Sequence, residues 1–126
     1  MIRSAQRLLI ADDNGDTAES LAALLRLDGH EVTVVHDGEQ ALEAIGRLRP
    51  DIALLDIGMP NISGYEVARR LRQSVPTAAV RLIAITGWGQ ERDKARAFEA
   101  GFDDHLTKPV EPDALIELLR RAGPQD

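Results

Sequence analysis

The sequence predicts an α/β protein, a single doubly wound, five-stranded parallel sheet with five helices. Three observations support this fold class. First, five short aliphatic runs alternate with segments that have the period of a helix. Second, the runs are continuously apolar, which is typical of strands that are covered on both faces. Third, strict alternation of strands and helices implies right-handed crossovers, with helices on both faces of the sheet.

The expected strands are rich in leucine, isoleucine, valine and alanine, and the last of them is the weakest. They cover residues 8–11, 32–35, 52–55, 80–85 and 102–106. Each is followed by a segment in which helical periodicity replaces the continuous apolar run. The sequence therefore predicts five strands in chain order, each leading into a helix.

Each expected helix is identified by apolar side chains, most of them in stripes with the 3.6-residue period of a helix. In chain order the stripes are Leu21, Leu24 and Leu25; Ala41, Leu42, Ile45 and Leu48; Val67, Ala68 and Leu71; for the fourth helix simply Ala95, Phe98 and Ala100; and Leu115, Ile116, Leu118 and Leu119. Gly29, Pro50, Pro76 and Gly101 follow the first four stripes, where glycine or proline ends a helix. Pro112 precedes the fifth stripe, because the first turn of a helix accepts proline.

Length and composition indicate one globular domain over residues 1–126. A chain of 126 residues can bury a core of its own. Hydrophobic residues make up 44% of it and charged residues 29%, the balance of a folded rather than a disordered protein. No linker or low-complexity tract divides the chain, and we expect residues 122–126 to form a short tail.

Charge and cysteine usage exclude several function classes. The net charge is −6, from 21 acidic and 15 basic residues, and nucleic acid or an anionic membrane would require a basic face. The absence of cysteine excludes disulfides, thiolate metal sites and a cysteine nucleophile. The sequence shows neither a signal peptide nor an apolar run of about 18 residues. We therefore expect a cytoplasmic protein that binds neither nucleic acid nor membrane.

Polar side chains gather at the carboxyl ends of the expected strands, the edge at which open α/β sheets bind ligands. Asp12 and Asp13 follow the first strand, Asp56 the third, Thr86 the fourth and Lys108 the fifth. If the first and third strands are neighbours, three carboxylates converge within a few ångströms. The sequence thus predicts one polar site at this edge.

The residue types at that edge are suited to a divalent cation and a phosphoryl group. Three clustered carboxylates repel one another unless a cation joins them, and Mg²⁺ is the hard ion expected with oxygen ligands and phosphate. Lys108 offers a compact positive charge and Thr86 a hydroxyl to phosphoryl oxygens. One aspartate could then act as a nucleophile and form an acyl phosphate.

Four motifs occur in order at the expected strand ends. They are Asp12-Asp13, Asp56-Ile57-Gly58-Met59-Pro60 with Gly64 four residues on, Thr86-Gly87, and Lys108-Pro109. Together they resemble the response-regulator receiver domain of two-component signalling, over about residues 7–121. The resemblance implies a flavodoxin-like sheet with strand order 2-1-3-4-5. It also implies a signalling domain that accepts a phosphoryl group, rather than an enzyme.

The resemblance assigns the acceptor and the metal ligands. Asp56 would be phosphorylated by a phosphohistidine on a histidine kinase or a histidine phosphotransfer protein. Asp13, Asp56 and the carbonyl oxygen of Gly58 would bind Mg²⁺ directly, and Asp12 would act largely through water. The run Ile85-Thr86-Gly87-Trp88-Gly89-Gln90 resembles the receivers of hybrid histidine kinases, so the domain could belong to such a kinase or act alone.

The resemblance also implies a switch. Thr86 and Lys108 would contact the phosphoryl oxygens, with a cis peptide bond after Lys108. His105 stands where the family often has a tyrosine or phenylalanine that moves as Thr86 moves inward. The surface formed by the fourth helix, the fifth strand and the fifth helix would then change and bind a downstream protein.

Simpler interpretations exist for several of these residues. Asp12 and Asp13 could be N-terminal helix caps, since acidic residues favour a helix start. His105 could be a histidine held at the sheet edge by its own hydrogen bonds instead of a switch. Asp56 could be a loop acid before a turn, and Lys108 could be solvated.

Two positions depart from the family pattern. Receivers often have polar side chains two residues after the phosphoacceptor and two after the threonine, where they orient the hydrolytic water. This chain has Gly58 and Trp88 there. We therefore predict slow self-dephosphorylation, with Trp88 shielding the acyl phosphate.

Two other function classes share parts of this pattern. A Mg²⁺-dependent phosphohydrolase with an aspartyl nucleophile is the main alternative, but it would have an Asp-x-Asp motif after the first strand and a cap region. A flavodoxin-like electron carrier would need a phosphate-binding loop at that place. The anionic run Asp12-Asp13-Asn14-Gly15-Asp16 would repel a flavin phosphate.

Overall fold

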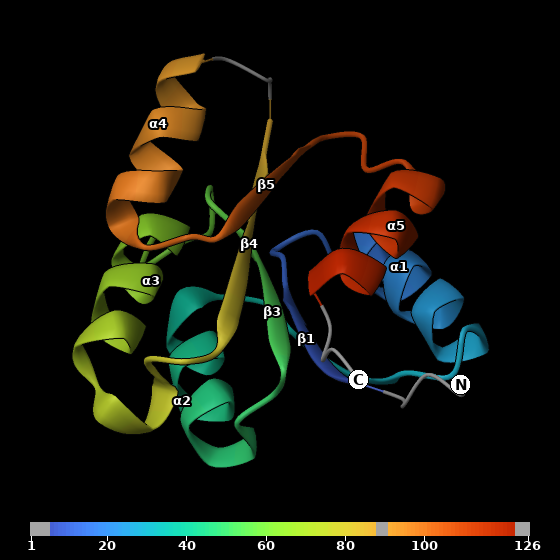
Figure 1. Cartoon of the computed structure of the whole chain (residues 1–126), viewed down its shortest axis with the longest axis horizontal. Helices are drawn as coiled ribbons and strands as arrows, with labels where there is room; N and C mark the ends of the chain where they lie inside the picture. Colours follow the sequence, from blue (N-terminus) through green and yellow to red (C-terminus); the bar gives the residue numbers. More distant parts are fainter. Residues whose placement is uncertain (1–5, 88–90, 123–126) are drawn as a thin grey trace.

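Within the part of the chain that the structure describes, five strands and five α-helices alternate, as the sequence predicts (Figure 1). The computed structural model describes residues 6–87 and 91–122. The strands are β1 Arg7–Ala11, β2 Glu31–Val35, β3 Ile52–Asp56, β4 Arg81–Thr86 and β5 Asp104–Thr107. The helices are α1 Gly15–Leu27, α2 Gly38–Leu48, α3 Gly64–Gln73, α4 Glu91–Ala100 and α5 Pro112–Ala122, with a short 3₁₀ helix, η1, over Val75–Thr77.

The strands form one parallel sheet in the order β2-β1-β3-β4-β5, which confirms the expected strand order. Strand β2 lies on one side of β1, and β3 is added on the other side, so β1 and β3 are neighbours. Their register pairs Ala11 with Leu55. The residues that follow these two positions, Asp12 and Asp56, therefore lie side by side at one edge.

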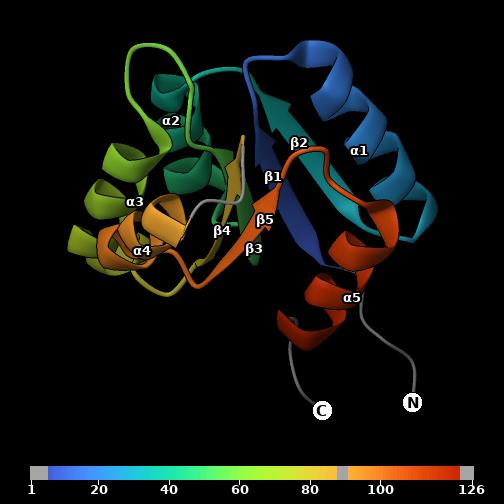
Figure 2. The same ribbon diagram turned by 90° about the horizontal axis from the view of Figure 1, so that it is seen from above.

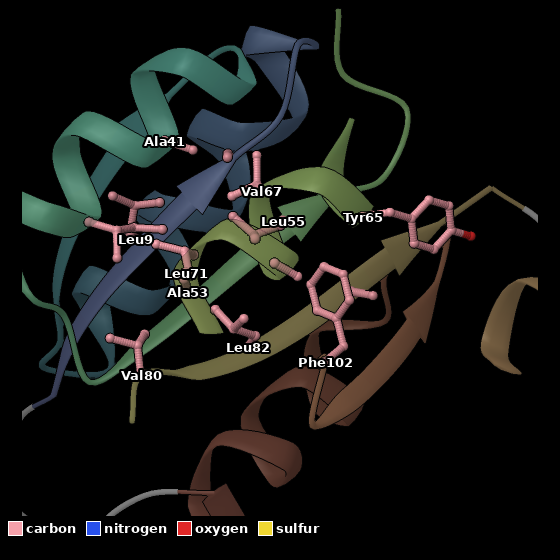
Figure 3. Packing of buried hydrophobic residues seen from close by; sticks show 14 of the residues in the cluster. Leu9, Ala41, Ala53, Leu55, Tyr65, Val67, Leu71, Val80, Leu82 and Phe102 are labelled. Carbon is pink, nitrogen blue, oxygen red and sulfur yellow. The ribbon is translucent and has the colours of Figure 1, made fainter. Parts of the chain in front are cut away.

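Alternation along the strands divides the core between the two faces of the sheet. Leu8 and Ile10 pack with α1 and α5, whereas Leu9 and Ala11 pack with the helices on the other face. Figure 2 shows α1 and α5 on one side and α2, α3 and α4 on the other. Figure 3 shows the hydrophobic cluster that contains Leu9, on the side of α2, α3 and α4, and this cluster extends to Phe102. Both faces of the central strands are thus covered.

The register of α4 differs from the expected stripe. The sequence predicts the fourth helix from Ala95, Phe98 and Ala100, whereas α4 buries Ala97 and Ala100. Ala95 is exposed, and Phe98 is 46% exposed. Side chains three residues apart share a helix face. The buried face of α4 therefore consists of two small side chains, Ala97 and Ala100.

The last strand begins later than expected, at Asp104 instead of residue 102. Gly101 ends α4 with a φ of 116°, and the N–H of Phe102 donates to the carbonyl oxygen of Ala97. Phe102 is therefore part of the helix cap, and its buried side chain packs in the core ahead of the strand. None of the described helices has the length and apolar character needed to cross a membrane.

Candidate functional site

Three carboxylates meet at the carboxyl ends of β1 and β3, as expected from the strand order. Asp12 directly follows β1, and Asp56 is the last residue of β3. One carboxylate oxygen from each of Asp12, Asp13 and Asp56 lies within 4.8 Å of the other two. Asp12 and Asp56 are buried, while Asp13 is exposed. The site therefore opens to solvent on the side of Asp13.

Asp12 is held by its local backbone and is not the cap of α1. The N-cap is Asn14, whose side chain accepts from the N–H of Thr17. One oxygen of Asp12, Oδ1, accepts the N–H of Asn14 at 2.9 Å. The other, Oδ2, is buried and has no hydrogen-bond partner within the described residues. The cap interpretation of Asp12 is thus wrong, because Asn14 occupies that position.

Burial raises the pKa of Asp12 to about 6. The N–H of Asn14 acts against this rise, and the neighbouring Asp56 adds to it. A buried carboxylate with one unpartnered oxygen is costly to ionise. A cation bound beside Asp12 would therefore stabilise its ionised carboxylate.

Asp56 is 5% exposed, and each of its carboxylate oxygens accepts one hydrogen bond. Oδ1 accepts the N–H of Gly58 at 3.0 Å, and Oδ2 accepts from the ammonium of Lys108 at 2.9 Å. The Lys108 ammonium also lies 4.0 Å from Oδ2 of Asp12. Asp56 is thus fixed at the strand end, and Lys108 joins the two buried carboxylates.

Lys108 reaches the site from the segment after β5, and the peptide bond between Lys108 and Pro109 is cis, as expected. Burial lowers the pKa of Lys108, but the hydrogen bond to Asp56 and the charges of the three aspartates outweigh it. The pKa of Lys108 therefore lies above its ordinary value, and the side chain is a permanent cation. The solvated interpretation of Lys108 does not hold.

The turn after β3 requires glycine at position 64. A Cβ atom there would lie 2.8 Å from the carbonyl oxygen of Asp56 and 2.8 Å from the Cα atom of Ile57. The N–H of Gly64 donates to the carbonyl oxygen of Ile57, and Ser63 caps α3 through the N–H of Glu66. Helix α3 thus starts directly against the backbone at the end of β3.

Thr86 and His105 contact each other directly. Thr86 ends β4, is buried, and has its Oγ1 atom 2.9 Å from Nε2 of His105 on β5. The hydroxyl also lies 3.5 Å from the carbonyl oxygen of Leu106, to which it can donate. The hydroxyl therefore faces the edge strand β5, and it must turn to reach a group bound at Asp56.

Two hollows adjoin the carboxylates. A cleft of about 430 Å³ is lined by Asp13, Asp56, Ile57, Gly58, Tyr65, Ile85, Thr86, Gly87, Arg96 and Lys108. A larger groove of about 740 Å³ is lined by Asp12, Asp16, Thr17, Ser20, Leu21, Leu24, Ile85, Gly87, Lys108, Pro109, Val110 and Pro112. Lys108 lines both, so the cleft over Asp56 and the groove beside α1 meet at this side chain.

Two residues of the cleft were not found from the sequence. Tyr65 is the second residue of α3, and Arg96 lies in the middle of α4. The guanidinium carbon of Arg96 lies 4.3 Å from the centre of the Tyr65 ring, a cation–π contact. Neither residue ends a strand, so the rule that identified the aspartates does not include them. The position of Tyr65 directly after Gly64 was the one available signal.

The chain matches one family over most of its length. Residues 8–120 match the family model of the response regulator receiver domain. PhoB, the phosphate regulon transcriptional regulatory protein of Pseudomonas aeruginosa, is 37% identical over 123 residues, which cover 94% of this chain and 54% of PhoB. MtrA, a DNA-binding response regulator of Mycobacterium tuberculosis, is 37% identical over 91% of this chain and 49% of MtrA. The chain thus spans about half the length of these curated relatives.

Similar solved structures are also response regulators or receiver domains. A response regulator from Chloroflexus aurantiacus superimposes with a TM-score of 0.90 at 36% identity, covering 94% of this chain and 98% of that chain. The receiver domain of the sensor histidine kinase PA1611 from Pseudomonas aeruginosa has a TM-score of 0.86 at 33% identity, with coverage of 94% and 97%. That structure has a magnesium ion coordinated in its active-site cleft.

Proposed function

The chain belongs to the family of response regulator receiver domains, which are phosphoryl-accepting signalling domains, and we propose that Asp56 is its acceptor residue. The single observation that supports this assignment best is the hydrogen bond of 2.9 Å between Asp56 and the ammonium of Lys108. It places a carboxylate nucleophile and a cation for phosphoryl oxygens together at the bottom of one cleft. Of the three aspartates, Asp56 alone both lines this cleft and accepts a hydrogen bond from Lys108.

A magnesium ion fits the donor set of the site. Asp12, Asp13 and Asp56 would hold it, with the carbonyl oxygen of Gly58, since Mg²⁺ prefers oxygen ligands from carboxylates. Oδ2 of Asp12 supports this proposal, because it is buried without a hydrogen-bond partner among the described residues and the Lys108 ammonium lies as far as 4.0 Å from it, so a directly bound cation would compensate its charge more fully. When bound, the ion supplies neutralisation of the negative charge on the carboxylates and on the phosphoryl oxygens.

Phosphotransfer requires one bond to form and one to break. A carboxylate oxygen of Asp56 forms a P–O bond with the phosphoryl group while the P–N bond of a phosphohistidine breaks, and the electron pair of that bond stays on the imidazole nitrogen. Lys108 moves from the carboxylate to a phosphoryl oxygen, a short displacement because it already lies at 2.9 Å. The hydroxyl of Thr86 turns away from His105 to donate to another phosphoryl oxygen.

The groove beside α1 is the proposed docking place of the phosphodonor. The donor histidine must approach Asp56 from outside the cleft, and the groove meets the cleft at Lys108. Leu21, Leu24 and Val110 give the groove an apolar lining, which suits a helix of a histidine kinase or histidine phosphotransfer protein. A donor seated there would have its histidine next to the acceptor.

The switch connects Thr86 to the opposite side of the domain. His105 lies on β5, the edge strand next to α4, and it is bonded to Thr86 in this state. When Thr86 turns to a phosphoryl group, this bond breaks and His105 moves inward. We propose that the surface of α4, β5 and α5, where Phe98 is exposed, then changes its affinity for a downstream protein.

Phosphorylation by acetyl phosphate with Mg²⁺ tests the assignment of Asp56. Intact mass should show a gain of about 80 Da on the wild type and none on Asp56→Asn. The exposed Asp113 in the first turn of α5 is a matched control, and Asp113→Asn should be phosphorylated like the wild type. A phosphate adduct on Asp56→Asn would place the acceptor elsewhere.

Thr86→Ala tests the switch. Nuclear magnetic resonance spectra of the phosphorylated and unphosphorylated wild type should differ along β5 and α4. With Thr86→Ala this difference should shrink, because the connection between the site and His105 is lost. Equally distinct spectra for the two states of the variant would contradict the coupling.

Three expectations from the sequence stay predictions. Gly58 has no side chain to orient a hydrolytic water, which supports slow self-dephosphorylation, and a phosphorylated lifetime of seconds would contradict it. Trp88, the other residue invoked, lies outside the described residues. The cytoplasmic location and the absence of nucleic-acid binding rest on sequence arguments, and PhoB and MtrA carry gene-regulatory and DNA-binding descriptions for chains about twice as long.

A further inference from the structure

The cleft over Asp56 has a second cation that none of the four motifs contains. Arg96 on α4 lines it together with Asp13, Asp56 and Lys108. Helices α3 and α4 lie side by side in both views (Figures 1 and 2). The guanidinium stacks over the ring of Tyr65 on α3, and the ring centre lies 4.3 Å from the guanidinium carbon. The tyrosine ring thus holds the arginine at the rim of the cleft.

The two cations of the cleft are in different situations. Lys108 donates to Asp56 and lies close to Asp12, so its charge is already shared between two carboxylates. Arg96 forms no salt bridge with the described side chains, and its guanidinium contacts the Tyr65 ring. Arg96 is also exposed, so it can change its rotamer without disturbing the core. Its charge is therefore available to a new anion.

A phosphoryl group on Asp56 would be such an anion. It adds about two negative charges and strong acceptor oxygens to a cleft that also contains Asp13. A guanidinium offers donors in a planar fork that matches phosphoryl oxygens, and a charge-assisted hydrogen bond is stronger than a cation–π contact in water. Phosphorylation would thus draw Arg96 from the ring towards the phosphoryl oxygens.

We propose that Arg96 is a phosphoryl-binding residue, which leaves the face of Tyr65 when Asp56 is phosphorylated and then contacts the phosphoryl group. This inference rests on the proposed role of Asp56. It adds a direct connection between the phosphoryl group and α4, separate from the connection through Thr86 and His105. The first connection runs from Thr86 on β4 to His105 on β5. The second runs from the phosphoryl group through Arg96 to α4.

Binding of beryllofluoride, a phosphoryl analogue, tests the proposal at saturating Mg²⁺. Arg96→Gln should weaken its apparent affinity by about fivefold to twentyfold, the effect of one partly exposed charge-assisted hydrogen bond. Arg96→Lys should recover part of this loss. Arg69→Gln removes an exposed arginine of α3 that pairs with Glu66 and is not among the residues that line the cleft over Asp56, and it should bind like the wild type.

Affinity for Mg²⁺ alone separates phosphoryl binding from a structural role. Arg96→Gln should bind Mg²⁺ as well as the wild type or better, because a positive charge near the carboxylates is removed. Unchanged beryllofluoride affinity in Arg96→Gln would overturn the proposal, and so would an equal loss of Mg²⁺ and beryllofluoride affinity. A wild type that takes neither beryllofluoride nor phosphate would instead overturn the role of Asp56, on which the proposal rests.

Discussion

Asp12→Asn should stabilise the metal-free protein at neutral pH. The substitution keeps an oxygen to accept the N–H of Asn14, now at 2.9 Å, and replaces the buried, unpartnered Oδ2 with an amide nitrogen. It therefore removes a buried negative charge next to Asp56 with little change of shape. The expected gain comes from no longer ionising a buried carboxyl whose pKa burial raises to about 6.

The size of the effect follows from the pKa of Asp12 in the two states. The Asp12 carboxyl has a pKa of about 6 in the folded chain, against the ordinary value of 3.8 in an unfolded chain. Protonation of Asp12 therefore favours folding fully below pH 3.8, and this contribution is lost as the pH rises through 6. At 1.36 kcal/mol per unit the total is on the order of 3 kcal/mol, with about 2 kcal/mol between pH 4.5 and 6.5.

Urea unfolding in the presence of a chelator measures this dependence. Other carboxyl groups titrate in both proteins, so the difference in unfolding free energy between Asp12→Asn and the wild type isolates Asp12. That difference should grow in favour of the variant by about 2 kcal/mol from pH 4.5 to 6.5. Asp113→Asn, at an exposed position in the first turn of α5, should show no such growth. A difference independent of pH would refute the reasoning.

Three further outcomes follow from the same site. Lys108→Met should slow phosphorylation by acetyl phosphate at least about tenfold, because a charge-assisted contact to the phosphoryl group is lost, yet strengthen Mg²⁺ binding; equal phosphorylation rates would contradict its role. Gly64→Ala should cost about 1–3 kcal/mol in urea unfolding, since its Cβ would lie 2.8 Å from the carbonyl oxygen of Asp56. The helical Gly46, with open space around its Cβ position, is the control, and Gly46→Ala should stabilise the protein by up to about 1 kcal/mol. Calorimetric titration of the wild type should show weaker Mg²⁺ binding below about pH 6, because protons compete for Asp12, and a constant affinity from pH 5 to 7.5 would exclude that competition.

The sequence was sufficient to predict the sheet and its polar edge. Continuous apolar runs identify strands buried on both faces, and parallel strands bring their carboxyl ends to one edge. Asp12, Asp56, Thr86 and Lys108 could therefore be grouped before any distance was known. The order β2-β1-β3-β4-β5 was expected from the resemblance alone, because periodicity does not determine which strands are neighbours.

Hydrogen bonds within the site were beyond sequence reasoning. The sequence does not distinguish an Asp12 that caps a helix from one that faces a cation, because both patterns place acidic residues before α1. The cap position was decided by Asn14, two residues later. Likewise, the sequence left His105 either as a switch or as a histidine fixed at the edge. The bond of 2.9 Å to Thr86 shows that the two interpretations are compatible in one state.

Helix α4 shows why the second cation of the cleft could not be predicted. Its buried face is formed by Ala97 and Ala100, and Phe98 projects to the outside. A pattern based on hydrophobic size selects Phe98 and so rotates the helix away from its actual register. In the observed register Arg96 lies next to Tyr65 and over the cleft. Tertiary packing therefore decides which helix side chains reach a site that strand ends define, and any signal that turns α4 must change the position of Arg96.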